Sequence, residues 1–412
     1  MAVSRRQVGV LLMALLGVLA LPAVSPEARS QPAGDAVDHG PGGAPYAAGE
    51  LLVTYEERAS DAAVESLDEE VGAEVGETLP EIDARLFEFP AVKGKLTEQA
   101  REQALARIKE ELERDPAVES VGYNYLYSAS FIPDDPRFPK QWGLRKTGFE
   151  NAWNSTLDSG VRLAIVDSGA DVRHEDLKQK IVRQRDLVNS DATVEDPLEH
   201  GTHVAGIAAA ETDNGDGVAG GCPNCALLIA KVLDGEGLGT ADDVAEGIIW
   251  GVDNGAKVIN LSLGDRGNAR VVRDAVDYAT NKGAVVVAAA GNLDHQNPKP
   301  TPIYPAAYPN AIAVAATNKE DQRPGFSNYG DWVDMAAPGV SILSTVPGGY
   351  YSFSGTSVAA PHVSALASLL ASQGLDRAGI KKRIFNTAVD LGRAGHDPSY
   401  GHGRMDAGRA VR

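Results

Sequence analysis

Residues 354–362, Ser-Gly-Thr-Ser-Val-Ala-Ala-Pro-His, lead from a turn into a helix of small and apolar residues. Apolar residues continue to Leu370 on nearly all sides of this predicted helix, which indicates a helix buried in a core. Pro361 lies early enough to be tolerated near the first turn. Ser357 would lie in that turn, where free backbone N–H groups and the helix dipole favour developing negative charge. Ser357 is therefore a candidate nucleophile, although a lone serine at a helix start is more often an N-cap.

Continuously apolar segments precede this helix and alternate with helical ones. The predicted strands are Arg162–Val166, Ala226–Leu233, Ala256–Leu263, Ala284–Ala290 and Ala311–Ala316, and the predicted helices include Ala241–Asp253, Ala269–Lys282 and Ser357–Ser372. Runs without polar alternation predict strands covered on both faces, hence a mostly parallel sheet in a doubly wound α/β domain. Sites in such sheets form beyond the carboxyl ends of the strands.

Polar residues stand at those strand ends. Asp167 follows the first predicted strand, Asn292 follows the fourth, and His200 opens another small-residue helix. Together with Ser357 they supply the acid, amide, base and nucleophile that acyl transfer needs. His203 lies at the same helix start as His200, so spacing alone does not choose the base. A zinc peptidase helix would need Glu beside the first histidine and a spacing of four, which this pair lacks.

Four motifs carry a family resemblance. They are Asp167-Ser168-Gly169, His200-Gly201-Thr202-His203-Val204-Ala205-Gly206, Ala290-Gly291-Asn292 and Gly355-Thr356-Ser357. In order and spacing they resemble the subtilisin-like serine peptidases, and among these the thermitase-like extracellular enzymes. The resemblance covers the chain from about Asp135 to its end. It implies a subtilisin-like fold and a serine endopeptidase.

The same resemblance implies the role of each catalytic residue. Ser357 attacks the peptide carbonyl, His200 accepts its proton, and Asp167 orients His200. Asn292 and the backbone N–H of Ser357 bind the oxyanion. His203 is then expected to be a packed structural histidine.

Substrate and metal sites are also implied by the resemblance. Ser262-Leu263-Gly264 and Gly237-Leu238-Gly239 would pair with the substrate backbone by strand addition. Tyr304-Pro305 would be a cis peptide. A structural calcium ion would take its ligands from Asp135, Asp176, Glu211, Asn214, Asp216 and Val218. Such hard oxygen ligands in a glycine-rich loop suit calcium.

The amino-terminal part has the composition of an export leader and a small separate domain. Residues 1–30 carry Arg5 and Arg6 before an apolar run, which predicts a signal peptide; a membrane anchor is the alternative. Residues 31–48 are rich in Gly, Pro and Ala and predict a linker. Residues 49–128 have a β-α-β-β-α-β pattern, the split-βαβ arrangement.

A split-βαβ segment before a subtilisin-like domain resembles an inhibitory propeptide that also assists folding. Its last residues would lie in the cleft like a substrate, with self-cleavage at a bond within residues 126–133. Residues 129–412 would then form the peptidase domain.

Composition limits the partners. Basic residues number 38 and acidic residues 57, a net charge of −19, so nucleic acid is not an expected partner. We expect a secreted, extracellular monomer that acts on proteins or peptides and leaves the membrane once the signal is removed. The two cysteines, Cys222 and Cys225, are expected to form a disulfide in an exported protein. A redox pair lacks a thioredoxin-like unit around it, and a zinc site lacks two further ligands.

Two other functions remain as alternatives. A catalytically silent relative could bind proteins through the same cleft, but all four catalytic positions are intact. An esterase of the α/β-hydrolase kind would order its triad Ser, Asp, His and use Gly-x-Ser-x-Gly. The order here is Asp, His, Ser, and Ala359 occupies the last glycine position.

Overall fold

The computed structural model describes most of the chain beyond residue 36. The described residues are 37–39, 45–126 apart from 57, 61–62, 65–66, 68–69 and 94–95, then 131–154, 160–189, 193–292 and 301–412. The predicted signal peptide lies outside them, as do residues 127–130 of the predicted cleavage segment. The chain divides into two compact units, Met1–Ser128 and Ala129–Arg412, and each is described by itself.

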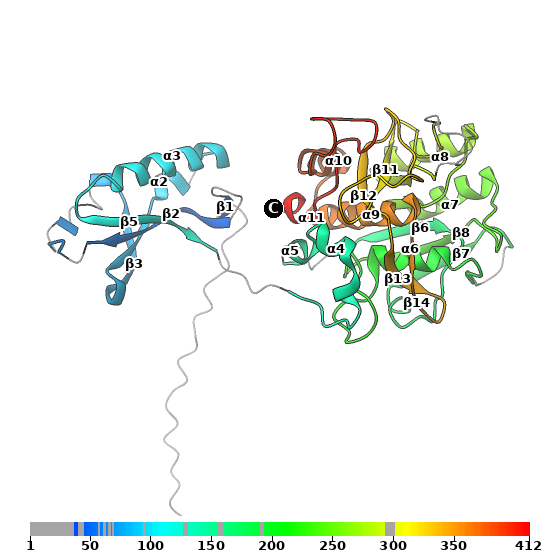
Figure 1. Ribbon diagram of the computed structural model, residues 1–412, viewed down its shortest axis with the longest axis horizontal. Helices are drawn as coiled ribbons and strands as arrows, with labels where there is room; N and C mark the ends of the chain where they lie inside the picture. Colours follow the sequence, from blue (N-terminus) through cyan, green and yellow to red (C-terminus); the bar gives the residue numbers. More distant parts are fainter. Residues whose placement is uncertain are drawn as a thin grey trace, which may run out of the picture. The chain divides into compact units, whose positions relative to one another are not determined.

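The first unit is an antiparallel sheet covered by helices on one face (Figure 1). Its strands are β1 (Val37–His39), β2 (Pro45–Tyr55), β3 (Glu74–Leu79), β4 (Ala84–Glu88) and β5 (Val118–Tyr125). The long strand β2 pairs with β1, β4 and β5, and β4 pairs with β3. Helices α2 (Pro90–Lys93) and α3 (Glu98–Leu112) supply Val92, Leu105 and Leu112 to a core with Leu51 and Phe87.

The predicted linker at residues 31–48 is wrong in part, because its described residues lie in the sheet. β1 and the start of β2 pair with each other, and Tyr46 is fully buried. Asp38 is also fully buried and accepts a hydrogen bond from Nε of Arg101 on α3 at 2.9 Å. The small residues of this segment show no alternation of polar and apolar positions, so the sequence did not predict a strand. Partners such as Arg101, which order the segment, are distant in sequence.

The second unit is built on a parallel seven-stranded sheet, as predicted. Its strands are β6 (Arg162–Asp167), β7 (Ile181–Asp186), β8 (Ala226–Lys231), β9 (Ala256–Leu261), β10 (Val285–Ala289), β11 (Ala311–Thr317) and β12 (Met335–Pro338). Their order across the sheet is β12-β11-β10-β9-β6-β8-β7. The edge strand β7 was not predicted because its residues 182–185 are exposed and mostly polar, without the apolar run of the inner strands.

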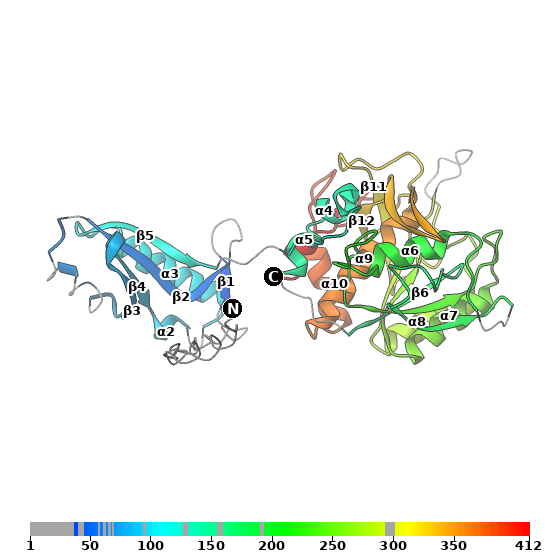
Figure 2. The same ribbon diagram turned by 90° about the horizontal axis from the view of Figure 1, so that it is seen from below.

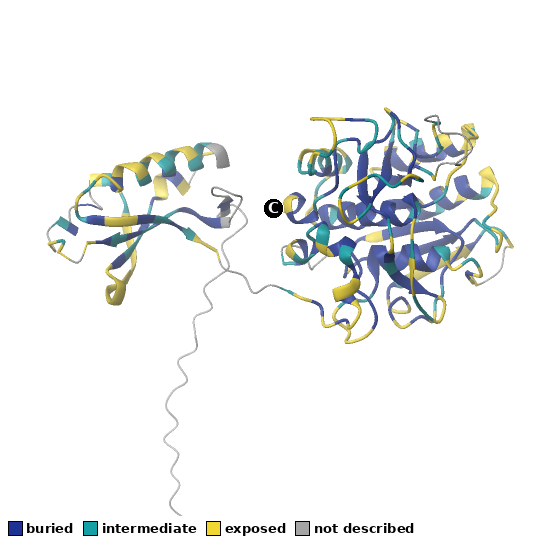
Figure 3. Cartoon of the chain, viewed as in Figure 1, coloured by how far each residue is buried: buried dark blue, intermediate teal, exposed yellow. Residues whose placement is uncertain are grey.

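Helices cover both faces of this sheet, so it has two cores (Figure 2). Helices α6 (His200–Ala209) and α9 (Thr356–Ser372) lie on one face, and α7 (Ala241–Asp253) and α8 (Arg270–Asn281) on the other. Alternate residues of β6 enter the two cores, Leu163 and Ile165 on one side and Ala164 and Val166 on the other. Inner strands are accordingly buried along most of their length (Figure 3).

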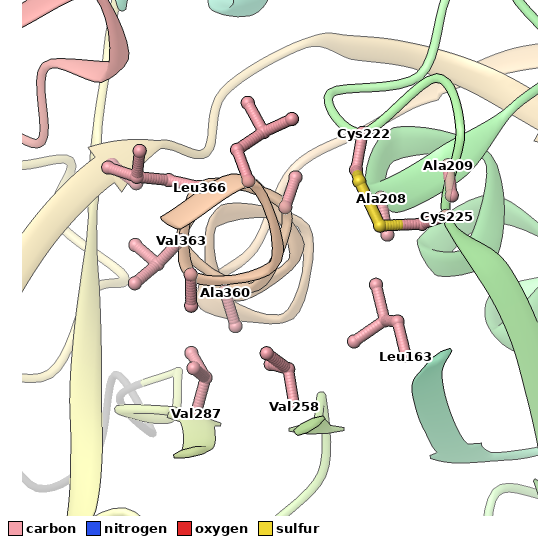
Figure 4. Packing of buried hydrophobic residues seen from close by; sticks show 14 of the residues in the cluster. Leu163, Ala208, Ala209, Cys222, Cys225, Val258, Val287, Ala360, Val363 and Leu366 are labelled. Carbon is pink, nitrogen blue, oxygen red and sulfur yellow. A yellow bond between two sulfur atoms is a disulfide. The ribbon is translucent and has the colours of Figure 1, made fainter. Parts of the chain in front are cut away.

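Helix α9 packs across the centre of the sheet, over β9, β10 and β11 (Figure 4). Ala360, Val363 and Leu366 belong to the same buried cluster as Val258 and Val287 of the strands. Cys222 and Cys225 form a disulfide at the edge of this cluster. Within the described part of the chain, no helix has both the length and the apolar content of a membrane span.

Short elements complete the second unit. They are α4 (Trp142–Lys146), α5 (Phe149–Trp153), α10 (Arg377–Asn386), α11 (Ala407–Ala410) and the hairpin of β13 (Ile342–Val346) and β14 (Gly349–Phe353). The hairpin was not predicted from sequence, and it packs against α6.

Candidate active site

The order of the strands reverses direction at β6. The chain adds β7 and β8 on one side of β6 and then β9 on the other. A reversal of this kind leaves a gap beyond the carboxyl ends of the strands. Asp167 is the last residue of β6, and Ser262 and Asn292 follow the next two strands, β9 and β10.

His200 is in direct contact with Asp167. Its Nδ1 lies 2.7 Å from Oδ1 of Asp167, whose side chain is fully buried while that of His200 is 23% exposed. Burial by itself lowers the pKa of His200, but the charge and hydrogen bond of Asp167 outweigh it, so the pKa is raised overall. Because the carboxylate can only accept, Nδ1 carries the ring proton and Nε2 is left to act as a base.

Ser357 and Asn292 border one small space. Oδ1 of Asn292 accepts a hydrogen bond from the N–H of Thr356 at 3.0 Å, which fixes the orientation of the amide. A methyl group added to Gly355 would lie 3.1 Å from Oγ of Ser357 and 3.4 Å from Nδ2 of Asn292. Ser357 is partly exposed. A hydroxyl beside an amide donor is the arrangement that nucleophilic attack with oxyanion binding requires.

His203 has different surroundings. Its Nε2 donates to the carbonyls of Ile342 at 3.0 Å and Tyr351 at 3.1 Å, and its ring stacks on Phe353 at 4.4 Å. Burial lowers its pKa to about 3. The neutral ring therefore ties α6 to the hairpin, and of the two histidines only His200 contacts a carboxylate.

Asp196 is a site-supporting residue that the sequence did not reveal. It is 5% exposed; its Oδ1 accepts from Oγ of Ser168 at 2.7 Å, and its Oδ2 accepts from the N–H of Thr202 at 2.7 Å. It thus joins the loop after Asp167 to the first turn of α6. Its negative charge also raises the pKa of His200. An aspartate four residues before His200 is a weak sequence signal, because exposed loops contain many aspartates.

The loop after Asp167 and the first turn of α6 are also joined by a glycine–glycine backbone contact and by a buried lysine. A methyl group at Gly201 would lie 2.2 Å from the carbonyl oxygen of Gly169, so only glycine permits this approach. Lys231, the last residue of β8, is 4% exposed and donates to the carbonyl of Ser168 at 2.6 Å. These contacts hold the residues after Asp167 against the start of α6.

The predicted substrate-binding segments lie in different surroundings. Ser262 is buried, whereas Leu263 and Gly264 are partly or fully exposed. In the second segment, the N–H of Leu238 donates to the carboxylate of Asp234, and its carbonyl accepts from the Asp234 N–H. The N–H of Gly237 also donates to the carbonyl of Asp234, so strand addition there would depend on the Gly237 carbonyl and on Gly239. The Tyr304–Pro305 peptide bond is cis.

The predicted calcium ligands are close to one another in the structure. Oδ1 of Asp176 accepts from Nδ2 of Asn214 at 3.0 Å, and Oδ2 accepts from the N–H of Val218 at 2.9 Å. The remaining predicted ligands are Glu211, whose N–H donates to the Asp176 carbonyl, and Asp216, whose N–H donates to Asn214.

Asp135 carries the strongest indication that a cation fits here. Its Oδ1 is buried without a hydrogen-bond partner, and Oδ2 accepts from the N–H of Asp213 at 2.8 Å. Burial raises the pKa of Asp135 to about 6, and the nearby charge of Asp176 adds to this. Buried carboxylates with an unpaired oxygen suit a hard cation. Among the described residues no three His, Cys, Asp or Glu side chains form a metal cluster, so such a site would also need backbone carbonyls.

Comparisons with known proteins identify the family. Residues 158–403 match the subtilase family, and residues 32–121 match the fervidolysin N-terminal prodomain. The chain belongs to the subtilase family. This subtilase is 41% identical over 369 residues to the thermophilic serine proteinase of Bacillus sp. (strain AK1), covering 89% of this chain and 88% of that relative. It is 47% identical over 283 residues to thermitase of Thermoactinomyces vulgaris, covering 68% of this chain and 99% of that relative.

A solved structure agrees with this assignment. A protease from Pseudoalteromonas arctica PAMC 21717 superposes with a TM-score of 0.62 at 31% identity, covering 68% of this chain and 99% of the other. The subtilase is therefore a serine endopeptidase, a hydrolase preceded by a prodomain. The predicted family, fold class and enzyme class are confirmed.

Proposed function

We propose that this subtilase is a secreted endopeptidase, made as a zymogen, whose catalytic triad is Asp167, His200 and Ser357. The observation that carries the proposal is the 2.7 Å contact between His200 Nδ1 and the buried carboxylate of Asp167. A carboxylate in this position fixes the histidine tautomer and stabilises the imidazolium that forms during catalysis.

The chemistry proceeds through an acyl-enzyme. Oγ of Ser357 attacks the peptide carbonyl while Nε2 of His200 takes its proton, and His200 then protonates the leaving amine. Water deacylates the enzyme by the reverse proton transfers. Asn292 Nδ2 and the N–H of Ser357 would stabilise the oxyanion, a role for which the matching amide in subtilisin is worth about 10²–10³ in turnover.

The prodomain is the proposed intramolecular inhibitor. The compact sheet unit, from β1 at Val37 to β5 at Tyr125, has its own core, which supports a separately folded segment. The match to a fervidolysin prodomain supports the same role. Cleavage within residues 126–133 would release the peptidase domain, proposed as residues 129–412, as the mature enzyme; residues 127–130 lie outside the described part of the chain.

Substrates are proposed to be proteins or peptides bound as an added strand. Ser262-Leu263-Gly264 would pair with the residues before the scissile bond, and Gly237-Leu238-Gly239 with residues further upstream. Glycines at both segments permit a close backbone approach. The leader at residues 1–30 supports export, and we expect the mature enzyme to be an extracellular monomer without nucleic-acid or membrane partners.

Calcium is the proposed structural cofactor. Asp135, Asp176 and Asn214 would hold it with side-chain oxygens, and Glu211, Asp216 and Val218 with backbone carbonyls. A bound calcium ion would neutralise the buried carboxylates and fix the loop. It takes no part in the proposed chemical steps.

The alternative is a catalytically silent relative that binds proteins through its cleft. One experiment separates the two. Wild type and Ser357→Ala, both without residues 1–30, are incubated with calcium and their intact masses compared. We expect wild type alone to lose its prodomain at a bond within residues 126–133. Retention of full length by both proteins would favour the silent relative, and equal cleavage of both would show that a different protease makes the cut.

A further inference from the structure

The carbonyl of the candidate nucleophile residue has lost its usual partner. In an α-helix, the carbonyl of residue i accepts from the N–H of residue i+4. For Ser357 that residue is Pro361, which lies inside α9 and has no N–H. The carbonyl of Ser357 instead accepts a hydrogen bond from Oγ of Ser262 at 2.7 Å.

Ser262 is itself held by a buried chain of hydrogen bonds. Nδ2 of Asn260 donates to Oγ of Ser262 at 2.9 Å, and Oγ of Ser364 donates to Oδ1 of Asn260 at 2.8 Å. Ser262 is 5% exposed, and Asn260 and Ser364 are fully buried. The chain runs from α9 to the end of β9 and back to Ser357. A buried polar network in which every polar group has a hydrogen-bond partner is rigid.

We infer that Ser262 is a positioning residue whose hydroxyl holds the nucleophile, Ser357, in place. This inference rests on the proposed function. Its hydrogen bond replaces the missing bond of the helix and aligns the first turn of α9 against β9. Displacement of a nucleophile by about 1 Å can reduce turnover about 10²-fold. Because Ser262 also belongs to the proposed substrate-pairing segment, one residue would link the bound peptide to the nucleophile.

A merely structural role would have a different signature. Removal of the hydroxyl would then lower stability without a selective effect on turnover by the folded enzyme. Ser368 provides a matched control on the same helix. It is fully buried, and its Oγ donates to the carbonyl of Ser364 at 2.9 Å, but it has no contact with Ser262 or Ser357 among the hydrogen bonds of the described residues.

The test compares wild type, Ser262→Ala, Ser364→Ala and Ser368→Ala, each expressed as the full chain and purified after maturation. Active sites are counted with a fluorophosphonate, so that misfolded molecules do not enter the rate. Peptide p-nitroanilide hydrolysis then gives kcat and KM per active site from pH 5 to pH 9, and thermal melts give stability.

We expect Ser262→Ala to lower kcat about 10- to 100-fold with KM within about twofold of wild type. The pH midpoint of the base should not move, because the hydroxyl acts on Ser357 and not on His200. Ser364→Ala should show a smaller loss of kcat, and Ser368→Ala none. Should Ser262→Ala fail to fold, Ser364→Ala against Ser368→Ala decides the question.

Two negative results are distinguishable. An active wild type whose kcat per active site matches that of Ser262→Ala would overturn the positioning role and leave the proposed function intact. A wild type that neither reacts with the fluorophosphonate nor hydrolyses the peptide would overturn the proposed function itself.

Discussion

The two histidines at the start of α6 lie three residues apart and have opposite electrostatic surroundings. His200 is partly exposed, and Asp167 raises its pKa despite the effect of burial. His203 is enclosed by the hairpin, where its Nε2 proton serves two carbonyls and burial lowers its pKa to about 3. The first ring can therefore gain a proton during catalysis, while the second stays neutral in the folded protein.

This difference predicts how acid affects stability. The unfolded chain protonates His203 near pH 6.5, whereas the folded state protonates it only near 3, so the unfolded state binds more protons between these values. The stability contribution of neutral His203 is complete above pH 6.5. It falls as the pH drops, by up to about 1.4 kcal/mol per unit.

His203→Gln keeps a hydrogen-bond donor but cannot titrate, so its free energy of unfolding should fall less between pH 6.5 and pH 4. Urea titrations in a Ser357→Ala background, which prevents autolysis, measure the difference. His362, whose pKa burial lowers to about 4, remains in both proteins and contributes equally. Identical pH dependence of the two proteins would show that His203 is not held neutral.

At the scale of elements, α6 and the hairpin are joined through backbone carbonyls and a glycine. Oγ of Ser344 donates to the carbonyl of His203 at 2.8 Å, and Oγ1 of Thr345 donates to that of Thr202 at 2.7 Å. Gly206 lies at this contact, and a methyl group there would be 2.2 Å from Oγ1 of Thr345. The close approach of strand β13 to α6 thus requires glycine at position 206, which has no side chain.

Gly206→Ala is expected to destabilise the enzyme although alanine is the better helix former. Helix propensity favours alanine by about 1 kcal/mol, but overpacking typically destabilises by about 1–3 kcal/mol, and the two hydroxyl bonds would be strained as well. A lower melting temperature in calorimetry would report the net loss. Gly325→Ala, whose added methyl group meets open space, serves as the control. A melting temperature equal to or above that of the control would contradict the contact.

The whole molecule contains two units with separate cores, and the proposed calcium site belongs to the second. Asp135 and Asp176 are buried in it at 2% and 0% exposure. Both have a raised pKa, chiefly because of burial. A cation that binds only the folded state would offset the free-energy cost of burying these two carboxylates and would stabilise the mature enzyme.

Calcium removal should therefore lower the melting temperature. At a calcium concentration about 100 times Kd, binding contributes about 2.7 kcal/mol, or about 4–5 °C for a unit of the size of residues 129–412. EGTA should abolish this shift in Ser357→Ala, and calcium but not magnesium should restore it. In Asp135→Asn the shift should be smaller. A melting temperature indifferent to EGTA would rule out the structural calcium ion.

The sequence by itself determined the fold class and the candidate residues. Continuous apolar runs predicted strands buried on both faces, and the observed strands differ from the predicted ones by a few residues. A parallel sheet gathers its carboxyl strand ends at one edge, so the polar residues at those ends, Asp167 and Asn292, could be recognised as candidates from their positions in the chain. The motifs that include His200 and Ser357 completed the set.

Only the tertiary structure decided which partners each residue meets. Tyr46 pairs with Tyr125, which orders a segment whose local composition predicts a linker. Asp196 meets Ser168, 28 residues away, and Ser262 meets Ser357, 95 residues away. Local periodicity reports which face of an element is apolar. It does not contain the long-range hydrogen bonds that place one buried polar side chain against another.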